Sequence, residues 1–237
     1  MSDKCAVVTG GARNIGGAIA ERLQKDGYRV VVLDVVEPEA ESLRADARQV
    51  DLSDRAAAEA AFAEIAADYP VTALINNVGI VAPAAFDAVD VDDFDRIMHL
   101  NTRTALVAAK ALVPAMRRLG GGRIVMNTSR VTLGKLNRTL YSASKGALQA
   151  MARTWALEFA GDGITVNCVA PGPIATTAFW QNNSPDSQST RDLIASIPLK
   201  RMGTPQDVAN AVSFFCSDDS SFVTGQTLFV CGGVTVG

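Results

Sequence analysis

The chain has 237 residues, of which 48% are apolar, 20% charged and 6% aromatic. Its 22 Lys and Arg residues against 25 Asp and Glu residues leave a net charge of −3, so it lacks the general positive field on which nucleic-acid and anionic-membrane binders depend. The composition is too apolar and too weakly charged for a disordered chain, and a chain of this length can bury a core without a disulfide or a metal.

The cysteine and histidine content argues against a metal centre. Cysteines stand at Cys5, Cys168, Cys216 and Cys231 without a Cys-x-x-Cys pair, and His99 is the single histidine. A structural zinc site needs about four clustered ligands, which this pattern does not supply. The thiols are typical of small buried side chains in a reducing compartment. Because the chain also runs directly into a predicted strand, without a secretory or membrane-spanning apolar segment, we expect a cytoplasmic protein.

Short β-branched segments alternate with longer helical patterns along the chain. Helices are predicted near residues 16–26, 54–68, 92–118, 141–160 and 205–217. The predicted strands are Lys4–Thr9, Arg29–Leu33, Arg48–Val50, Thr72–Asn76, Arg123–Asn127, Thr165–Val169 and Thr227–Val230. Several strands are apolar at nearly every position, as strands covered on both faces should be. Alternation of this length predicts right-handed crossovers and a parallel sheet flanked by helices.

Local signals refine several boundaries. Ser53 is expected to cap the alanine-rich helix that follows it, and Thr204 with Asp207 forms a predicted capping pair around a first-turn proline. The longest polar stretch, Gln181–Arg191, is expected to be a loop, and loops of that length in compact domains are usually lids or disordered segments.

A glycine-rich turn joins the first predicted strand to the first helix. It runs from Thr9 to Gly16 and contains Gly10, Arg13, Asn14 and Ile15. Such a turn lets a phosphate approach the backbone and sets a pyrophosphate at the positive end of the helix. The alternative is an ordinary tight turn, but the strand before it and the helix after it favour the phosphate interpretation.

Asp34 ends the second predicted strand, 18 residues after Gly16. At that spacing a carboxylate accepts hydrogen bonds from the adenosine ribose hydroxyls of a dinucleotide and repels a 2′-phosphate. Val35 and Val36 follow without a cation, so NAD is favoured over NADP. Arg13 is the contrary feature, because it could reach a 2′-phosphate. A solvated carboxylate at the strand end is the structural alternative for Asp34.

Two further strand ends carry candidate cofactor contacts. The pair Asp51 and Leu52 follows the third strand, where the carboxylate could accept from an adenine amino group or could serve the start of the next helix. After the fourth strand, Asn77 can fix backbone geometry and Gly79 permits close approach by a cofactor, although an ordinary turn would also use these residues.

Tyr141 and Lys145 carry the sharpest chemical signal. Residues four apart share one helix face, and an ammonium beside a phenol is expected to lower the phenol pKa from about 10 toward neutrality. The tyrosine then becomes a usable general acid or base. An exposed tyrosine packed on a lysine stem is the usual alternative. Here Ser129 closes the fifth strand 12 residues earlier, where its hydroxyl could polarise a carbonyl facing the tyrosine.

Together these motifs resemble the short-chain dehydrogenase/reductase family in its compact form, over essentially the whole chain. The resemblance implies a doubly wound Rossmann-type α/β fold with a seven-stranded sheet, a single NAD(P)-binding domain over residues 1–237, and a homotetramer. It assigns the family's catalytic tetrad to Asn101, Ser129, Tyr141 and Lys145. By resemblance Ser129 positions the substrate oxygen and Tyr141 transfers its proton. Lys145 also holds the nicotinamide ribose, and Asn101 supports a water relay.

The resemblance also implies nicotinamide contacts at the turn after the sixth strand, from Pro171, Gly172, Ile174 and Thr176. Departures from the family pattern occur elsewhere. Asn14 stands where a second glycine is usual, and asparagine adopts left-handed geometry better than most residues. Val78 replaces the usual alanine, and Cys231 an aspartate that many members have before the terminal glycine pair.

The residues and the resemblance therefore predict an NAD-linked dehydrogenase that interconverts a secondary alcohol and a ketone, with NADP possible. A 3-hydroxyacyl or 3-oxoacyl thioester and a small cyclic alcohol or polyol both remain open as substrates. The alternative from another class is a cofactor-binding regulator that has lost catalysis, against which the retained tetrad counts. A longer sugar-nucleotide epimerase is disfavoured, because only about 60 residues follow Gly172. His99 is expected to be structural, while Arg130 could steer an anionic substrate or simply be solvated.

Two features outside the tetrad complete the prediction. The segment 177–197 is expected to be a lid over the active site, with a polar middle and apolar ends at Phe179-Trp180 and Leu193-Ile194. Helices near 92–118 and 141–160 are expected to pair between subunits, or else to pack under their own sheet. Their alanines are Ala105, Ala108, Ala109, Ala147 and Ala150.

Overall fold

Seven parallel strands form one sheet in the computed structural model, which describes residues 4–236 apart from the side chain of Asn182. The strands are β1 (Cys5–Thr9), β2 (Arg29–Asp34), β3 (Arg48–Gln49), β4 (Val71–Asn76), β5 (Gly122–Asn127), β6 (Ile164–Pro171) and β7 (Thr227–Val230). Their order across the sheet is β3-β2-β1-β4-β5-β6-β7. The predicted parallel sheet is confirmed, and each strand end falls within two residues of its prediction.

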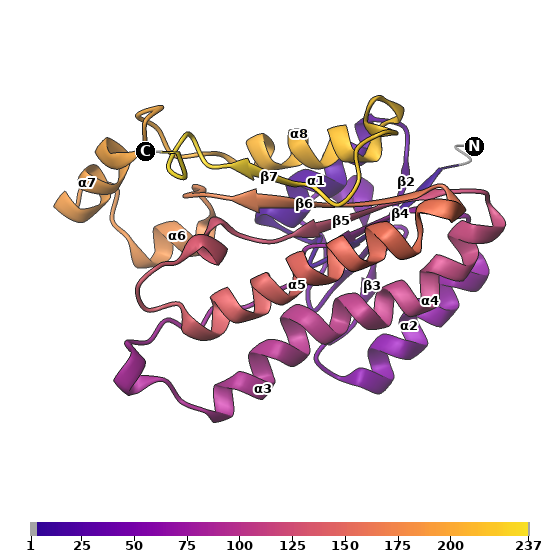
Figure 1. Cartoon of the computed structure of the whole chain (residues 1–237), viewed down its shortest axis with the longest axis horizontal. Helices are drawn as coiled ribbons and strands as arrows, with labels where there is room; N and C mark the ends of the chain where they lie inside the picture. The colour runs from indigo at the N-terminus through magenta and orange to yellow at the C-terminus, as the bar shows by residue number, and fades with distance from the viewer. Residues whose placement is uncertain (1–3, 237) are drawn as a thin grey trace.

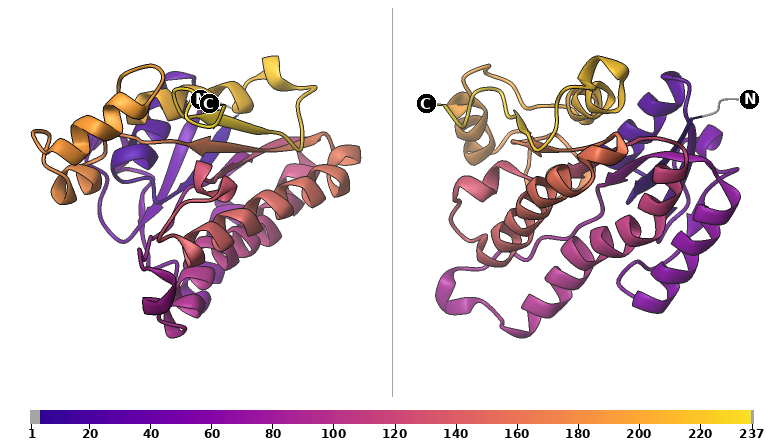
Figure 2. Two further views of the ribbon diagram at one scale, coloured as in Figure 1. Left: turned by 60° about the vertical axis from the view of Figure 1, so that its left-hand side comes forward. Right: turned by 45° about the vertical axis from the view of Figure 1, so that its right-hand side comes forward.

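Helices cover both faces of this sheet (Figure 1). One face carries α1 (Asn14–Lys25) and α8 (Pro205–Cys216), and the other carries α2 (Arg55–Asp68), α4 (Thr104–Arg118) and α5 (Thr139–Glu158). Three shorter helices complete the fold: α3 (Asp92–Met98), which leads into α4, and α6 (Thr177–Asn182) and α7 (Gln188–Ser196). The two further views in Figure 2 show α6 and α7, in orange, beyond the end of the sheet. The expected doubly wound Rossmann-type fold is confirmed.

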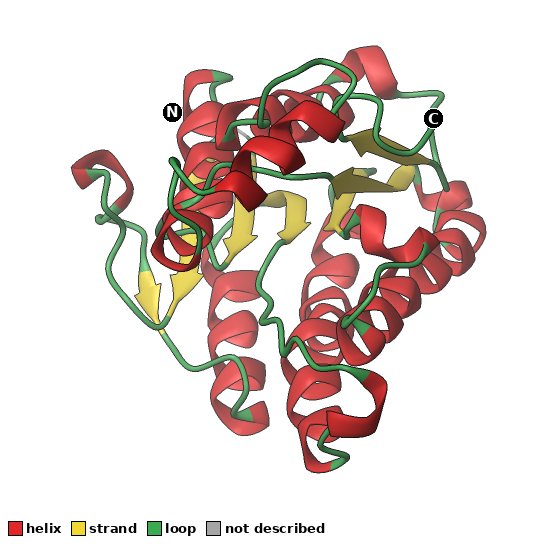
Figure 3. Cartoon of the chain, turned by 90° about the vertical axis from the view of Figure 1, so that its left-hand side faces the viewer, coloured by secondary structure: helices red, strands yellow, loops and turns green. Residues whose placement is uncertain are grey.

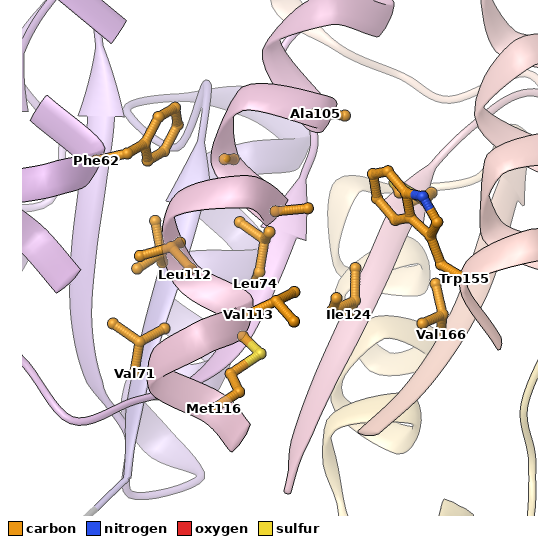
Figure 4. Packing of buried hydrophobic residues seen from close by; sticks show 14 of the residues in the cluster. Phe62, Val71, Leu74, Ala105, Leu112, Val113, Met116, Ile124, Trp155 and Val166 are labelled. Atoms are coloured by element: carbon orange, nitrogen blue, oxygen red, sulfur yellow. The ribbon is translucent and has the colours of Figure 1, made fainter. Parts of the chain in front are cut away.

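Successive side chains of each buried strand point to opposite faces of the sheet, so each strand contributes to two hydrophobic layers. In β1, Val7 packs with the layer under α2, α4 and α5, whereas Val8 packs with the layer under α1 and α8. Figure 4 shows the first layer, in which Phe62 of α2 and Leu112 of α4 meet Leu74 of β4. Because both faces are covered, all five residues of β1 are buried, which explains why the strand is apolar at almost every position.

A π-helical turn interrupts the long helix predicted over 92–118. α3 and α4 are joined by His99–Arg103, where the backbone N–H of Thr104 donates to the carbonyl of His99, five residues back. The wider turn accompanies the fixed position of Asn101, whose side chain bonds the backbone of Ile80 rather than facing solvent. Such insertions are frequent at functional sites. The prediction of one continuous helix is therefore wrong in this detail.

Two other local predictions are corrected. Asp54, not Ser53, caps α2, because its carboxylate accepts from the backbone N–H groups of the first turn, while Ser53 bonds Asp51. The polar stretch predicted as a loop contains helical residues, since Thr176 caps α6 and Ser187 caps α7 through their hydroxyls. The capping pair of Thr204 and Asp207 at the start of α8 is confirmed.

The alanines and cysteines lie mostly inside the chain's own core. Ala105, Ala108 and Ala109 of α4 are buried against the sheet, so they do not offer the flat outer surface that we expected of them. The four cysteines are free and buried. Within residues 4–236, no helix combines the length and the apolar character needed to cross a membrane. No group of His, Cys, Asp and Glu side chains in that part of the chain is arranged so that it could hold a metal ion.

Candidate active site

The predicted site residues gather at one edge of the sheet, where the parallel strands end. Figure 3 looks toward this edge. The glycine-rich turn follows β1, Asp34 ends β2, Gly79 lies beyond β4, Ser129 lies beyond β5, and Gly172 follows β6. In open α/β sheets this edge is where ligands bind, because the loops that leave the strands form a crevice there.

Tyr141, Ser129 and Lys145 come together at the end of β5. Tyr141 lies in the first turn of α5, and the Ser129 hydroxyl is near enough to its phenol to favour the deprotonated form. Lys145 is one turn further along, with its Nζ 5.7 Å from the centre of the Tyr141 ring. The Lys145 side chain is almost fully buried, whereas Tyr141 keeps partial exposure. The site is therefore open to solvent on the side of Tyr141 and closed on the side of Lys145.

Burial governs the acid–base character of both groups. It raises the pKa of Tyr141 to about 12, against the Ser129 hydrogen bond and the positive charge of Arg138, which both act to lower it. It also lowers the pKa of Lys145 to about 8, because an ammonium is poorly solvated at this depth. The expectation that Lys145 would bring the phenol pKa toward neutrality is therefore not met: the phenol holds its proton more firmly than in water.

Asn101 holds the loop after β4 against α5. Its Oδ1 accepts from the backbone N–H of Ile80 at 2.8 Å, and its Nδ2 donates to the Ile80 carbonyl and to the Ser144 hydroxyl, each at 3.0 Å. Gly79 lies directly against this junction. A Cβ on Gly79 would stand 3.1 Å from Asn101 Oδ1 and 3.2 Å from Lys145 Nζ. The absence of a side chain at Gly79 thus keeps the space beside Lys145 open.

A chain of hydrogen bonds connects Lys145 to the glycine-rich turn. Lys145 Nζ donates to the Asn127 carbonyl at 2.8 Å, and Asn127 Nδ2 donates to Asn77 Oδ1 at 2.7 Å. Asn77 Nδ2 in turn donates to the carbonyls of Thr9 and Gly10. Asn77 therefore fixes backbone geometry as predicted. Sequence reasoning missed Asn127 and Thr9, although each is a polar residue that ends a buried strand, and that position was the available signal.

The glycine-rich turn folds tightly enough to require its glycines. A Cβ on Gly16 would lie 1.8 Å from the Gly10 carbonyl oxygen, and Gly10 itself has a φ of +62°. Asn14 adopts the left-handed conformation expected of it, with a φ of 51°. Helix α1 then begins at Asn14 without a side-chain cap and without an acidic residue in its first turn. Its first N–H groups are thus available to an anion.

Asn14 also makes a contact that the sequence did not indicate. Its Oδ1 accepts from the backbone N–H of Thr177 at 2.8 Å, which ties the glycine-rich turn to the start of α6. Beside it, the exposed side chain of Arg13 makes no hydrogen bond or ion pair within the described residues. Ile15, which follows, is partly buried against the core under α1 and α8.

The two predicted carboxylates at the β2 and β3 ends have backbone partners. Asp34 Oδ2 accepts from the N–H of Ala12 at 3.0 Å, and its Oδ1 accepts from the N–H of Val35 at 2.8 Å. This arrangement aims Asp34 at the glycine-rich turn. Asp51 Oδ1 accepts from both the N–H and the hydroxyl of Ser53, so Asp51 orders the residues just before α2, as the helix-start alternative predicted. Leu52 beside it is buried.

The turn after β6 packs against the end of the chain. A Cβ on Gly172 would lie 2.7 Å from both Cα and Cβ of Cys231, so this turn packs closely against Cys231. Ile174 is buried and pairs through its backbone with Gly203, and Thr176 caps α6. Pro171 ends β6 itself. The predicted nicotinamide-contacting residues thus form one continuous path from the sheet to α6.

Similarity to known proteins extends over the whole fold. A family model described as enoyl-(acyl carrier protein) reductase matches residues 10–235. An NADPH-dependent aldehyde reductase-like protein from Arabidopsis thaliana is 34% identical over 257 residues, an alignment that covers 98% of this chain and 94% of the relative. A short-chain type dehydrogenase/reductase from Sinorhizobium fredii, described as uncharacterized, is 34% identical, with 100% and 99% covered.

A solved structure extends the likeness to three dimensions. A Beutenbergia cavernae protein described as an NAD(P)-dependent gluconate 5-dehydrogenase, with bound NADP at low occupancy, superposes with a TM-score of 0.90. The two sequences are 32% identical, and the match covers 100% of this chain and 98% of the other. The likeness includes every strand end at which the candidate site residues gather.

Proposed function

This chain belongs to the short-chain dehydrogenase/reductase family, whose members bind a nicotinamide cofactor, and we propose that it interconverts a secondary alcohol and a ketone at Tyr141. The observation that carries the proposal is the approach of the Ser129 hydroxyl to the Tyr141 phenol, with Lys145 one helical turn away. Two hydroxyls at one point match the needs of a single substrate oxygen: one holds it and the other exchanges its proton.

In this proposal Tyr141 acts as the general acid in reduction and the general base in oxidation. Its raised pKa keeps the phenol protonated at neutral pH, which suits donation to the oxygen of a ketone. Ser129 holds that oxygen in place. When bound, the nicotinamide supplies or accepts the hydride. The reverse reaction requires Tyr141 to take up a proton, so alcohol oxidation is expected to speed up toward alkaline pH.

We assign positioning and relay roles to Lys145 and Asn101. Lys145 Nζ donates to the Asn127 carbonyl and has further donors to offer the hydroxyls of a nicotinamide ribose. The close approach of Gly79 keeps room for such a ligand. Asn101, fixed by Ile80 and Ser144, holds the π-helical turn whose carbonyls could bind a water beside Lys145. Protons would then pass from Tyr141 toward solvent along this side of the site.

The residues at the sheet edge fit a dinucleotide. The uncapped start of α1 and the tight turn at Gly16 suit a pyrophosphate, and Asp34 suits the adenosine ribose. Asp51 is available to accept a hydrogen bond from the adenine amino group, since one of its carboxylate oxygens has no partner within the described residues. We propose NAD rather than NADP, because Asp34 is held toward the turn and would repel a 2′-phosphate.

Arg13 is the residue that argues for NADP, and two of the similar proteins described above are an NADPH-dependent reductase and a dehydrogenase with bound NADP. Kinetics with both cofactors decides the matter. We expect kcat/KM to favour NAD⁺ by at least about tenfold, which corresponds to roughly 1.4 kcal/mol. A preference for NADP⁺ that disappears in Arg13→Gln would contradict the assignment and make Arg13 the 2′-phosphate ligand.

We further propose that residues 177–197, with α6 and α7, form a lid over the site within a single domain of residues 1–237. The segment starts at Thr176, beside the turn after β6, and Asn14 joins its first residue to the glycine-rich turn. Hydrogen exchange tests the lid: residues 177–197 should become more protected when NADH and a substrate analogue bind. Equal protection in both states would rule it out.

We propose a homotetramer and a cytoplasmic location. A hollow of about 330 Å³ runs between α4 and α5 on the outer face, with Leu106, Val113 and Trp155 among its lining residues, and it offers apolar surface to a second subunit. Light scattering that finds a monomer at micromolar concentration would refute the oligomer. The four free buried thiols suit a reducing compartment.

The proposed activity is tested by a screen of secondary alcohols with NAD⁺ and NADP⁺, followed at 340 nm. Thioester, cyclic and polyol substrates belong in this screen, because each contains a secondary alcohol or ketone on which Tyr141 could act. Cofactor reduction by at least one alcohol is the expected result. Cofactor binding without turnover of any alcohol or ketone would favour a regulator instead.

A further inference from the structure

A hollow of about 600 Å³ opens beside the start of α5, the helix that carries Tyr141 in its first turn. Thr139, two residues before Tyr141, is part of its wall. The other lining residues come from the loop that precedes α5 and from the segment between β4 and α3, and none of them is acidic: Phe86, Leu133, Gly134, Lys135, Leu136 and Asn137. The hollow thus lies at the end of α5 that holds Tyr141.

Lys135 lines the hollow, while Arg130 and Arg138 belong to the same segment between β5 and α5 and act on the charge of Lys135; we call these three residues the cationic rim. The pKa of Lys135 lies below its usual value, first through loss of solvent and then through the charges of Arg130 and Arg138. The three charges therefore act on one another. Arg138 also acts on the phenol of Tyr141, which places the rim within electrostatic reach of the reacting site.

The cationic rim has no compensating carboxylate within the described residues. None of its members takes part in an ion pair, and its one side-chain hydrogen bond runs from Arg138 Nη1 to the Asn137 carbonyl at 2.8 Å. Arg117 and Arg201, by contrast, each pair with an aspartate. Like charges held together without a counterion destabilise the free protein, and a bound anion would remove that cost.

Apolar side chains share the hollow with the cations. Phe86 is 81% exposed, Leu133 62% and Leu136 88%, so three large apolar groups face solvent at the place where the cations gather. A neighbouring apolar and cationic surface matches a ligand with an apolar body and a negative group. The start of α5 adds its uncapped N–H groups to the same positive region.

We infer that the substrate is an organic anion: a ketone or secondary alcohol that also carries a carboxylate or phosphate group, which binds Arg130, Lys135 and Arg138. Its apolar part then covers Phe86, Leu133 and Leu136. The inference rests on the proposed function, because it places the reacting carbon at Tyr141. The negative group can belong to the substrate's own skeleton or to the phosphates of a coenzyme A handle, and both offer the charged oxygens that arginine binds in bidentate fashion.

Matched pairs of substrates test the inference. The first pair is an oxocarboxylate and its methyl ester, and the second is a 3-oxoacyl-coenzyme A and the N-acetylcysteamine thioester of the same acyl group. For wild-type protein we expect kcat/KM to favour the anion at least tenfold in one pair. Preference in the first pair identifies a carboxylate of the substrate, and preference confined to the second identifies the coenzyme phosphates. Added salt should reduce the preference, since it screens charges.

Variants connect the preference to the rim. In the double variant Arg130→Gln/Lys135→Gln the anion-to-neutral ratio of kcat/KM should fall at least tenfold, and in Lys135→Glu it should fall further than in Lys135→Gln. Lys25→Gln is the matched control, because Lys25 is exposed on the last turn of α1, at the opposite end of the sheet. It should keep the wild-type ratio within twofold. The neutral member of each pair reports in the same preparation whether the variant is folded and active.

Two results would overturn the inference: equal kcat/KM for both members of both pairs in the wild type, or a ratio that is the same in the double variant and in Lys25→Gln. If no ketone is reduced, the proposed function fails by itself, and binding decides the inference. Calorimetric titration with butyryl-coenzyme A and with hexanoate should then show at least tenfold weaker binding of one of them to the double variant. Unchanged affinity for both would exclude an anion site.

Discussion

The inner side of the candidate site and its outer rim treat polar side chains in opposite ways. Lys145, Asn101 and Asn127 are buried, and each has a hydrogen-bond partner at 2.7–3.0 Å. Arg130 and Lys135 on the rim have none within the described residues. The comparison separates two tasks. The buried residues hold a fixed geometry that serves one proton transfer, whereas the cations of the rim remain available to bind a substrate.

The largest expected effect comes from Tyr141→Phe on the inner side. Loss of the hydroxyl removes the proton donor, so kcat should fall by about 10²–10⁴, the range typical of a general acid. The ring remains to pack, and NADH affinity measured by fluorescence titration should change less than about threefold. Activity within tenfold of the wild type would remove Tyr141 from the mechanism.

Tyr28→Phe is the matched control for that substitution. Its hydroxyl donates to the Cys216 carbonyl at 2.7 Å, far from the sheet edge that holds the site. We expect a loss of about 1 kcal/mol in the free energy of unfolding, with kcat unchanged.

Lys145→Met tests the buried ammonium in two ways. It should lower both kcat and cofactor affinity, since we assign the ammonium to the nicotinamide ribose and to the path along which protons leave Tyr141. It should also change the pH dependence of stability. The pKa of Lys145 falls from 10.5 to about 8 on folding, so between these values the folded protein binds fewer protons than the unfolded chain.

The free energy of unfolding of the wild type should therefore rise relative to the Lys145→Met variant as the pH increases from about 8 to 10, by an amount of the order of 1–3 kcal/mol. The raised pKa of Tyr141 acts in the opposite direction only above pH 10 and is common to both proteins. Urea unfolding at several pH values measures the difference. A gap independent of pH would mean that Lys145 titrates normally.

Gly79→Ala should disturb the inner side without breaking the fold. The added methyl would press on Asn101 Oδ1 and Lys145 Nζ, and a small displacement of a positioned group is costly in rate. We expect kcat/KM to fall about tenfold. Gly146→Ala is the control, because a Cβ there meets nothing within 4 Å and a helical glycine gains about 0.5–1 kcal/mol of stability on this change. Equal activity in the two variants would show that the space beside Lys145 is not needed.

The smallest effect is expected at the link between the glycine-rich turn and the lid. Asn14→Gly keeps the left-handed backbone but removes the acceptor of the Thr177 N–H. Amides of residues 177–182 should exchange several-fold faster, while global stability changes by no more than about 1 kcal/mol. Asn137→Gly, at a φ of 60° but without a contact to α6, should leave these amides unchanged. Equal exchange rates of these amides in the two variants would show that the glycine-rich turn does not restrain the lid.

The same contrast decides what the sequence could predict. The strands were predictable because burial on both faces requires apolar residues throughout, and their ends then located Asp34, Asn77 and Ser129. The π-helical turn was not, because it depends on the bonds of Asn101 to Ile80, a contact between segments 21 residues apart. α6 and α7 are short helices that begin at the capping hydroxyls of Thr176 and Ser187, in a stretch whose serines, asparagines and proline suit a loop equally well.

Properties that depend on how deeply a side chain is buried could not be predicted from the sequence either. The spacing of Tyr141 and Lys145 correctly puts them one turn apart, but burial, not the ammonium, sets the direction of the phenol pKa. Asn127 acts on Lys145 through a backbone carbonyl, which every residue possesses and no motif reveals. The grouping of Lys135 and Arg138 with Arg130 needed the fold of the loop between them.

The central claim is direct hydride transfer at the site built around Tyr141, and isotope transfer tests it most directly. An accepted secondary alcohol with deuterium at the carbinol carbon is incubated with NAD⁺, and the reduced cofactor is weighed by mass spectrometry. The account predicts one deuterium in each reduced cofactor with the wild-type protein, and almost no reduced cofactor with Tyr141→Phe. Deuterium that appears in the solvent, or equal labelling by both proteins, would contradict it.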